Sequence, residues 1–169
     1  MKSILAVSFI GNDVGSWEFS MAAASVPYNV QWLGTTYRIC LTAEQTVSRL
    51  GIFESLSQPG YGPPRHIHDE EDETFYIQSG EVEFWMNGQT CIVGPGSVVH
   101  VPRGTEHAFR VLDDRPARML TVMTPGGFEG FFAEMATHKC RIPDDMDQIA
   151  AIGARFGLTF TGPPLGAAW

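Results

Sequence analysis

The chain has 169 residues, of which 44% are hydrophobic and 18% charged, and its formal net charge is −8. This length suits one domain with a sizeable core, and the composition is that of a globular protein rather than a disordered one. Phosphate binding needs clustered basic side chains, and the 11 Lys and Arg residues form no basic run, which argues against a nucleic-acid partner. No apolar stretch approaches the roughly 20 residues that span a bilayer, so we expect no membrane partner.

The start of the chain and its cysteines both favour a cytoplasmic protein. The apolar run from Ile4 to Ile10 is too short for a secretory signal, and Asp13 follows it closely. Three cysteines cannot all pair, and their wide spacing matches no C-x-x-C motif. We therefore expect reduced thiols at Cys40, Cys91 and Cys140.

Residues 35–124 consist of short strand-like runs separated by Gly, Pro, Asn and Asp, which is typical of an all-β sandwich or barrel. The expected strands cover residues 36–41, 49–56, 73–78, 81–86, 91–93, 97–101, 107–112 and 118–123. The segment from Gly60 to Pro64 forces a loop, and Asn87-Gly88 is a strong signal for a tight hairpin.

The two flanking regions are predicted to lie outside the barrel. Residues 1–34 form an N-terminal arm, which either swaps onto a partner subunit or is poorly ordered. Residues 125–169 supply helices at 128–138 and 145–156, with Asp144 as the N-cap of the second, and an extended tail on the barrel surface from residue 158. Since sheet edges need cover, we expect a homodimer.

Residues 66–73 contain the clearest candidates for a functional site. His66 and His68 are two positions apart on a strand, so they project from the same face. Glu73 opens the next strand and shares its face with apolar side chains, where a carboxylate is costly unless it is paired or binds a metal. The acidic run 69–72 between them is most simply a solvated turn.

A third imidazole, His107, opens a later strand whose inward row is also apolar. Three imidazoles and one carboxylate on inward rows predict a site for one divalent transition metal ion, with Fe, Mn, Co, Ni, Cu and Zn all suitable. His100 and His138 belong to no such group of potential metal ligands and are interpreted as structural or surface residues.

These residues resemble the two motifs of the cupin superfamily. The first, G-x₅-H-x-H-x₃₋₄-E-x₆-G, is matched at Gly60, His66, His68, Glu73 and Gly80. The second, G-x₅-P-x-G-x₂-H-x₃-N, is matched at Gly96, Pro102, Gly104 and His107, with Val111 in place of the final Asn. The resemblance implies a single jelly-roll-like cupin barrel with short C-terminal helices, and it implies that His66, His68, Glu73 and His107 are the metal ligands.

Further stretches, at residues 85–88, 101–105, 124–132 and 162–166, are similar to bacterial single-domain cupins described as quercetin 2,3-dioxygenase-like. That resemblance covers roughly residues 35–166. It implies a metal-dependent dioxygenase that acts with dioxygen on a flavonol-like, enolic or phenolic small molecule. It also implies that the ligand Glu73 deprotonates the substrate hydroxyl.

Strand alternation predicts an apolar substrate pocket walled by Phe75, Ile77, Phe109 and Val111. Two other functions fit the same residues. One is non-redox cyclisation, isomerisation or dehydration in a biosynthetic pathway, with the metal as a Lewis acid. The other is binding of a small ligand without turnover. The sequence leaves the metal, the substrate and the choice among these chemistries open.

Overall fold

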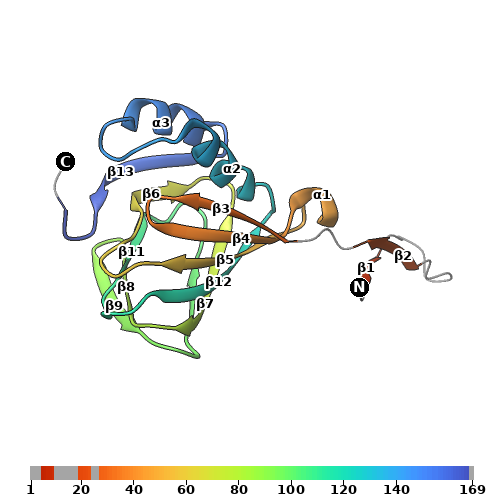
Figure 1. Ribbon diagram of the computed structural model, residues 1–169, viewed down its shortest axis with the longest axis horizontal. Helices are drawn as coiled ribbons and strands as arrows, with labels where there is room; N and C mark the ends of the chain where they lie inside the picture. The colour runs from red at the N-terminus through yellow and green to blue at the C-terminus, as the bar shows by residue number, and fades with distance from the viewer. Residues whose placement is uncertain (1–4, 10–18, 24–26, 168–169) are drawn as a thin grey trace.

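The computed structural model describes residues 5–9, 19–23 and 27–167, and its main feature is a pair of facing antiparallel β-sheets (Figure 1). The larger sheet contains β3 Tyr28–Trp32, β4 Thr35–Leu41, β5 Gly51–Ser57, β7 Asp72–Ser79, β10 Val98–Val101 and β12 Ala117–Thr124. Their order across the sheet is β10-β7-β12-β5-β4-β3.

The smaller sheet contains β6 Pro64–His68, β8 Val82–Met86, β9 Gln89–Val93, β11 His107–Val111 and β13 Leu158–Pro164. Its order is β13-β6-β11-β8-β9, so the chain crosses repeatedly from one sheet to the other between β5 and β12. Such crossing closes two sheets into a jelly-roll-like barrel. The predicted all-β fold class is confirmed.

The turn between β8 and β9 follows the sequence prediction. Asn87 and Gly88 both have positive φ, 45° and 83°, as a type I′ hairpin turn requires. Met86 then faces Gln89 across the turn, and the two strands remain paired to Val82 and Val93.

The interior contains two hydrophobic cores. One fills the barrel between β7, β8, β11 and β12 and includes Ile77, Val82 and Val111. The other lies at the opposite end and joins the sheets to the C-terminal helices, with Phe53 and Met135 among its members. Inward and outward residues alternate along β5, β6 and β12, which is why short alternating runs could be recognised in the sequence.

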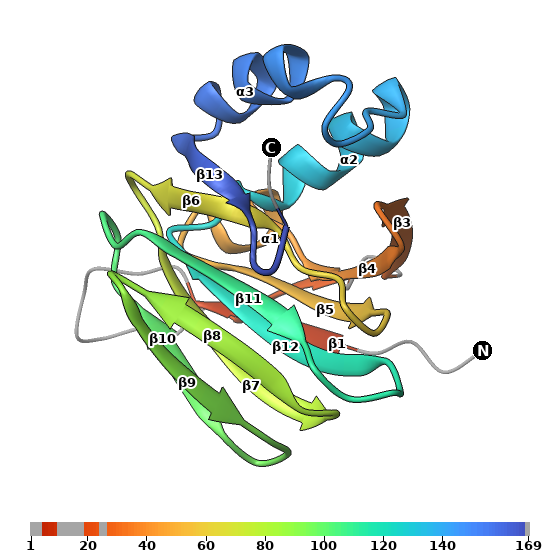
Figure 2. The same ribbon diagram turned by 90° about the vertical axis from the view of Figure 1, so that its left-hand side faces the viewer.

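The C-terminal helices pack over the end of the sheets where β3 and β13 lie (Figure 2). Helix α2 spans Glu129–His138 and helix α3 spans Met146–Ala154, close to the predicted ranges, while a short helix α1 spans Ala43–Thr46. The predicted N-cap of α3 was wrong by one position. Asp145 caps the helix, because its carbonyl accepts the first intrahelical bond, from the backbone N–H of Ile149 at 2.9 Å.

The tail prediction also needs correction. From Leu158 the chain forms β13, which pairs with β6 in the smaller sheet instead of lying on the barrel surface. Leu158 is 3% exposed and belongs to the core. The strand lies at the sheet edge, where its prolines cost no ladder hydrogen bonds.

The N-terminal region is described only in part, since residues 1–4, 10–18 and 24–26 of the predicted arm lie outside the described residues. Strands β1 Leu5–Phe9 and β2 Phe19–Ala23 pair antiparallel with each other, and β3 already belongs to the larger sheet before residue 35. The domain boundaries, the swapped arm and the homodimer stay predictions. Across the described ranges, no helix is long and apolar enough to cross a membrane, and the three cysteines are free as expected.

The loop that leads into β6 passes very close to β11. Its backbone is held there by hydrogen bonds from the Gly60 N–H to the Val111 carbonyl at 2.9 Å and from the Val111 N–H to the Tyr61 carbonyl at 3.0 Å. A Cβ atom at Gly62 would lie 1.8 Å from the Phe109 carbonyl oxygen. Only glycine allows this approach, which fixes where β6 begins.

The substitution Gly62→Ala should therefore lower the free energy of unfolding by about 2 kcal/mol or more, because backbone must move to admit the methyl group. Urea denaturation of the metal-free protein measures this. Gly94→Ala is the matched control, since a Cβ there meets nothing within 4 Å, and it should change the stability by less than about 0.5 kcal/mol. Equal stability of the two variants would contradict the close approach.

Candidate metal centre

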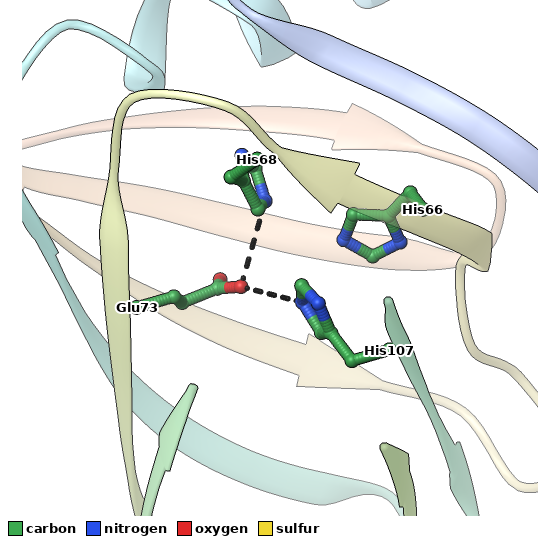
Figure 3. A group of neighbouring side chains, drawn as sticks. All are labelled: His66, His68, Glu73 and His107. Atoms are coloured by element: carbon green, nitrogen blue, oxygen red, sulfur yellow. Dashed lines mark hydrogen bonds and ion pairs between the residues drawn. The ribbon is translucent and has the colours of Figure 1, made fainter. Parts of the chain in front are cut away.

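Three strands bring the four predicted ligand residues together. His66 and His68 come from β6, Glu73 from β7 and His107 from β11 (Figure 3). The register pairs His107 directly with His66, so the two imidazoles lie side by side across the smaller sheet. All four side chains are buried, with residue exposures between 1% for His107 and 6% for His66.

The spacing of the four side chains suits a single ion. One potential ligand atom of each residue lies within 4.8 Å of those of the others. Glu73 Oε2 is 3.1 Å from His107 Nε2 and 3.5 Å from His68 Nε2. Two atoms that each lie about 2.1 Å from one ion, at right or tetrahedral angles, are about 3.0–3.4 Å apart. Nitrogen and carboxylate donors in this number fit a divalent transition metal.

Backbone carbonyls select the tautomers of two histidines. His66 Nδ1 lies 2.7 Å from the Pro64 carbonyl oxygen, and His107 Nδ1 lies 2.9 Å from that of Thr105. Because a carbonyl oxygen only accepts, each Nδ1 carries the proton and donates it. The Nε2 atoms therefore point toward Glu73 and the cluster interior, which is the arrangement that metal-binding imidazoles use.

The histidine charges follow from burial and from Glu73. Burial, with the neighbouring imidazoles, holds the pKa of His66 well below its ordinary value, and burial lowers the pKa of His68 to about 4. Both rings are thus neutral and able to bind a metal at neutral pH. Burial would also lower the pKa of His107, but its hydrogen bond to Glu73 raises that pKa overall. A metal ion at Nε2 would take the place of this proton.

Glu71 is a site residue that the sequence analysis missed. The acidic run was interpreted as a solvated turn, yet Glu71 is only 7% exposed. Its Oε2 lies 3.8 Å from His68 Nδ1, and neither atom has a hydrogen-bond partner within the described part of the chain. Burial, with the charge of Glu70, raises the pKa of Glu71 to about 7. Its position two residues before Glu73, on the same alternating row, was a usable signal.

An ion pair holds the two motifs against each other. Asp72, next to Glu73, accepts hydrogen bonds at 3.0 Å from the backbone N–H, Nε and Nη2 of Arg103, in the turn before β11. These bonds hold the pKa of Asp72 far below its usual range. Because the ion pair is partly exposed, it adds little to the stability of the fold, and its main effect is to orient the turn at Arg103 against the start of β7.

Beside the cluster lies a cavity of about 550 Å³, open solvent at its mouth included. Its walls are mostly aromatic and come from the barrel, from α2 and from β13: Trp32, Tyr37, Phe53, Phe75, Phe109, Phe128, Phe131, Phe132 and Phe160. His66, His68 and Glu73 form part of the same wall. A mostly aromatic lining with a few polar side chains is typical of a small-molecule site.

The predicted pocket residues divide into two groups. Phe75 and Phe109 line the cavity. Ile77 and Val111 are 0% and 1% exposed and pack in the barrel core beyond it. The aromatic wall supplied by α2 and β13 lay in regions for which the sequence predicted only outer packing.

The two other histidines lie away from the cluster. His100 is exposed and its Nδ1 lies 2.9 Å from Thr74 Oγ1, and His138 is exposed at the end of α2. Both positions agree with the interpretation of these histidines as structural or surface residues.

Comparison with known families agrees with the fold and the cluster. Residues 54–123, which include all four clustered side chains, match the family described as Cupin domain. Residues 54–123 thus have the sequence of a cupin domain. The sequence relatives of the chain include quercetin 2,3-dioxygenase of Bacillus subtilis (strain 168), 34% identical over 96 residues, which are 57% of this chain and 28% of that protein. The corresponding enzyme of Aspergillus japonicus is 32% identical over 99 residues, 52% of this chain and 28% of that protein.

The chain thus spans 28% of the length of these two relatives. Among solved structures, the polyketide cyclase RemF from Streptomyces resistomycificus superposes with a TM-score of 0.51 and 24% identity, over 61% of this chain and 77% of that one. That likeness establishes the barrel fold alone.

Removal of the Glu71 carboxylate should weaken metal binding. Glu71 Oε2 faces His68 Nδ1 at 3.8 Å, and a carboxylate beside the outer nitrogen of a metal-binding histidine orients the ring and makes it more basic. We expect Glu71→Ala to raise the dissociation constant for Zn²⁺ by about 10- to 100-fold, and Glu71→Gln to raise it less, because an amide oxygen would still face His68 Nδ1. Competition with a chromophoric chelator measures both.

Glu70→Ala provides the control, since Glu70 is the exposed neighbour in the same acidic run and should bind Zn²⁺ like the wild type. Unchanged affinity in Glu71→Ala would show that Glu71 does not support His68.

Proposed function

We propose that this protein is a metal-dependent dioxygenase that acts on a flavonol-like, enolic or phenolic small molecule, with His66, His68, Glu73 and His107 holding one metal ion. The observation that carries the proposal is the position of this buried cluster in the wall of an aromatic cavity. When bound, a redox-capable ion would supply the electron transfer that lets dioxygen react with an organic molecule.

Glu73 is the candidate general base. Its Oε2 lies at the cavity wall within hydrogen-bond distance of His107 Nε2, and the residue is 5% exposed. A substrate hydroxyl that donates to this carboxylate would pass its proton to it, leaving an enolate or phenolate.

The cavity walls favour a planar, aromatic substrate. Tyr37 and Phe132 stack with centroids 3.8 Å apart, and Phe128 stands edge-on to the ring of His68 at 4.4 Å. Such rings bind other rings by stacking and edge contacts, and they exclude water from the reacting atoms. The quercetin 2,3-dioxygenases related in sequence act on substrates of this class by their names, which supports the proposal.

Oxygen uptake by the metal-loaded protein tests the function. With quercetin and simpler enols offered in turn, we expect substrate-dependent consumption of dioxygen. Conversion of substrate without oxygen uptake would instead favour Lewis-acid cyclase or isomerase chemistry, and tight binding without conversion would favour a ligand-binding cupin.

Glu73→Gln should lower kcat/KM by about 100-fold or more, because the amide cannot take a proton from the substrate. Metal content is measured on the same sample, so that loss of the ion is separated from loss of the base. Glu81→Gln, an exposed substitution outside the cavity, should leave kcat/KM unchanged. A Glu73→Gln variant that retains metal and full activity would remove Glu73 from the base role.

A further inference from the structure

Two buried hydroxyl groups in the cavity wall have no part in the metal cluster. Ser55 is 2% exposed and Thr121 is 0% exposed, and both line the cavity. Neither Ser55 Oγ nor Thr121 Oγ1 has a hydrogen-bond partner among the described residues. Buried polar groups in native proteins nearly always have a hydrogen-bond partner. Two buried hydroxyls without one in the same cavity therefore point to a ligand that forms hydrogen bonds with them.

The next inward serine of the same strand shows the contrast. Ser57 is also buried, but it does not line the cavity, and its Oγ accepts a hydrogen bond from Thr35 Oγ1 at 3.1 Å. On this inward row of β5, the serine hydroxyl that lies in the packed interior has a hydrogen-bond partner inside the protein. Ser55 differs from Ser57 in facing the cavity.

The strand register arranges the two hydroxyls in line with Glu73. Met123 pairs with Glu73 across β12 and β7, which makes Thr121 the diagonal neighbour of Glu73. Met119 pairs with Ser55 across β12 and β5, which makes Ser55 the diagonal neighbour of Thr121. Each diagonal step is roughly 7–8 Å. The two hydroxyls thus mark a polar track that leads away from Glu73 across the larger sheet.

We infer that Ser55 and Thr121 form a subsite for a second oxygen function of the substrate, remote from the oxygen that reaches Glu73. Hydroxyls donate to a carbonyl or accept from a hydroxyl, and the flanking rings of Phe53 and Phe75 suit an apolar part of the ligand beside that oxygen. This inference rests on the proposed function and narrows its substrate class to enols or phenols that carry a further hydroxyl or carbonyl group remote from the reacting enol, on a part of the molecule where 3-hydroxyflavone carries none.

Binding of two flavonols to the metal-loaded protein under anaerobic conditions tests the subsite without turnover. Quercetin carries hydroxyl groups on both ring systems, and 3-hydroxyflavone lacks all of them except the enolic one. We expect the double variant Ser55→Ala/Thr121→Val to weaken quercetin binding by about 10-fold or more, since two hydrogen bonds are lost. Binding of 3-hydroxyflavone should change by less than about 2-fold.

Stability provides a second measurement that separates a ligand subsite from a structural role. Removal of an unpaired buried hydroxyl costs the fold nothing, so the double variant should unfold in urea at the wild-type midpoint or above it. Ser57→Ala is the matched control. It leaves Thr35 without its partner, so it should unfold at a lower midpoint yet bind quercetin like the wild type.

Equal effects of the double variant on both flavonols, or no effect on either, would overturn the subsite while leaving the dioxygenase proposal to the oxygen-uptake test. A lower unfolding midpoint in the double variant would show that the hydroxyls are structural and would overturn the subsite as well. A wild-type protein that binds neither flavonol would overturn both the subsite and the flavonol-like substrate.

Discussion

The burial of three imidazoles and a carboxylate among aromatic rings is the constraint on which the rest of the structure depends. At exposures of 1–6%, water does not solvate these groups, and their desolvation must be offset by one another, by backbone carbonyls or by an ion. The carbonyls of Pro64 and Thr105 take the outward nitrogens of His66 and His107. The remaining ligand atoms of the four residues face inward and lie within 4.8 Å of one another.

The barrel has a packed end and a hollow end, and the cluster lies at the hollow one. The inward rows of β7 and β11 run from Ile77 and Val111 in the packed core to Phe75 and Phe109, which line the cavity. The C-terminal quarter of the chain completes that cavity, since Phe128 and Phe132 at α2 and Phe160 on β13 form part of its wall. A small molecule in this cavity would therefore contact α2 and β13 as well as the strands that carry the four clustered side chains.

Local pattern was enough to predict β4, β5 and β7–β12, the Asn87-Gly88 turn and the four clustered side chains, because alternation and turn chemistry act over a few residues. Features that depend on distant pairing were not predictable. Residues 158–164 contain two prolines and were interpreted as a surface tail, yet the free edge of β6 accepts them as a strand. Glu71 stands in the acidic run 69–72, so its place on the row of Glu73 is easily overlooked in the sequence, and the fold shows that it turns inward beside His68.

Anomalous diffraction from crystals grown with Zn²⁺ tests the central claim most directly, namely that these four side chains hold one ion. We expect one strong anomalous peak per chain, about 2.0–2.2 Å from the Nε2 atoms of His66, His68 and His107 and from a carboxylate oxygen of Glu73. A peak at other residues, or no peak in a protein whose four side chains keep the geometry described above, would contradict it.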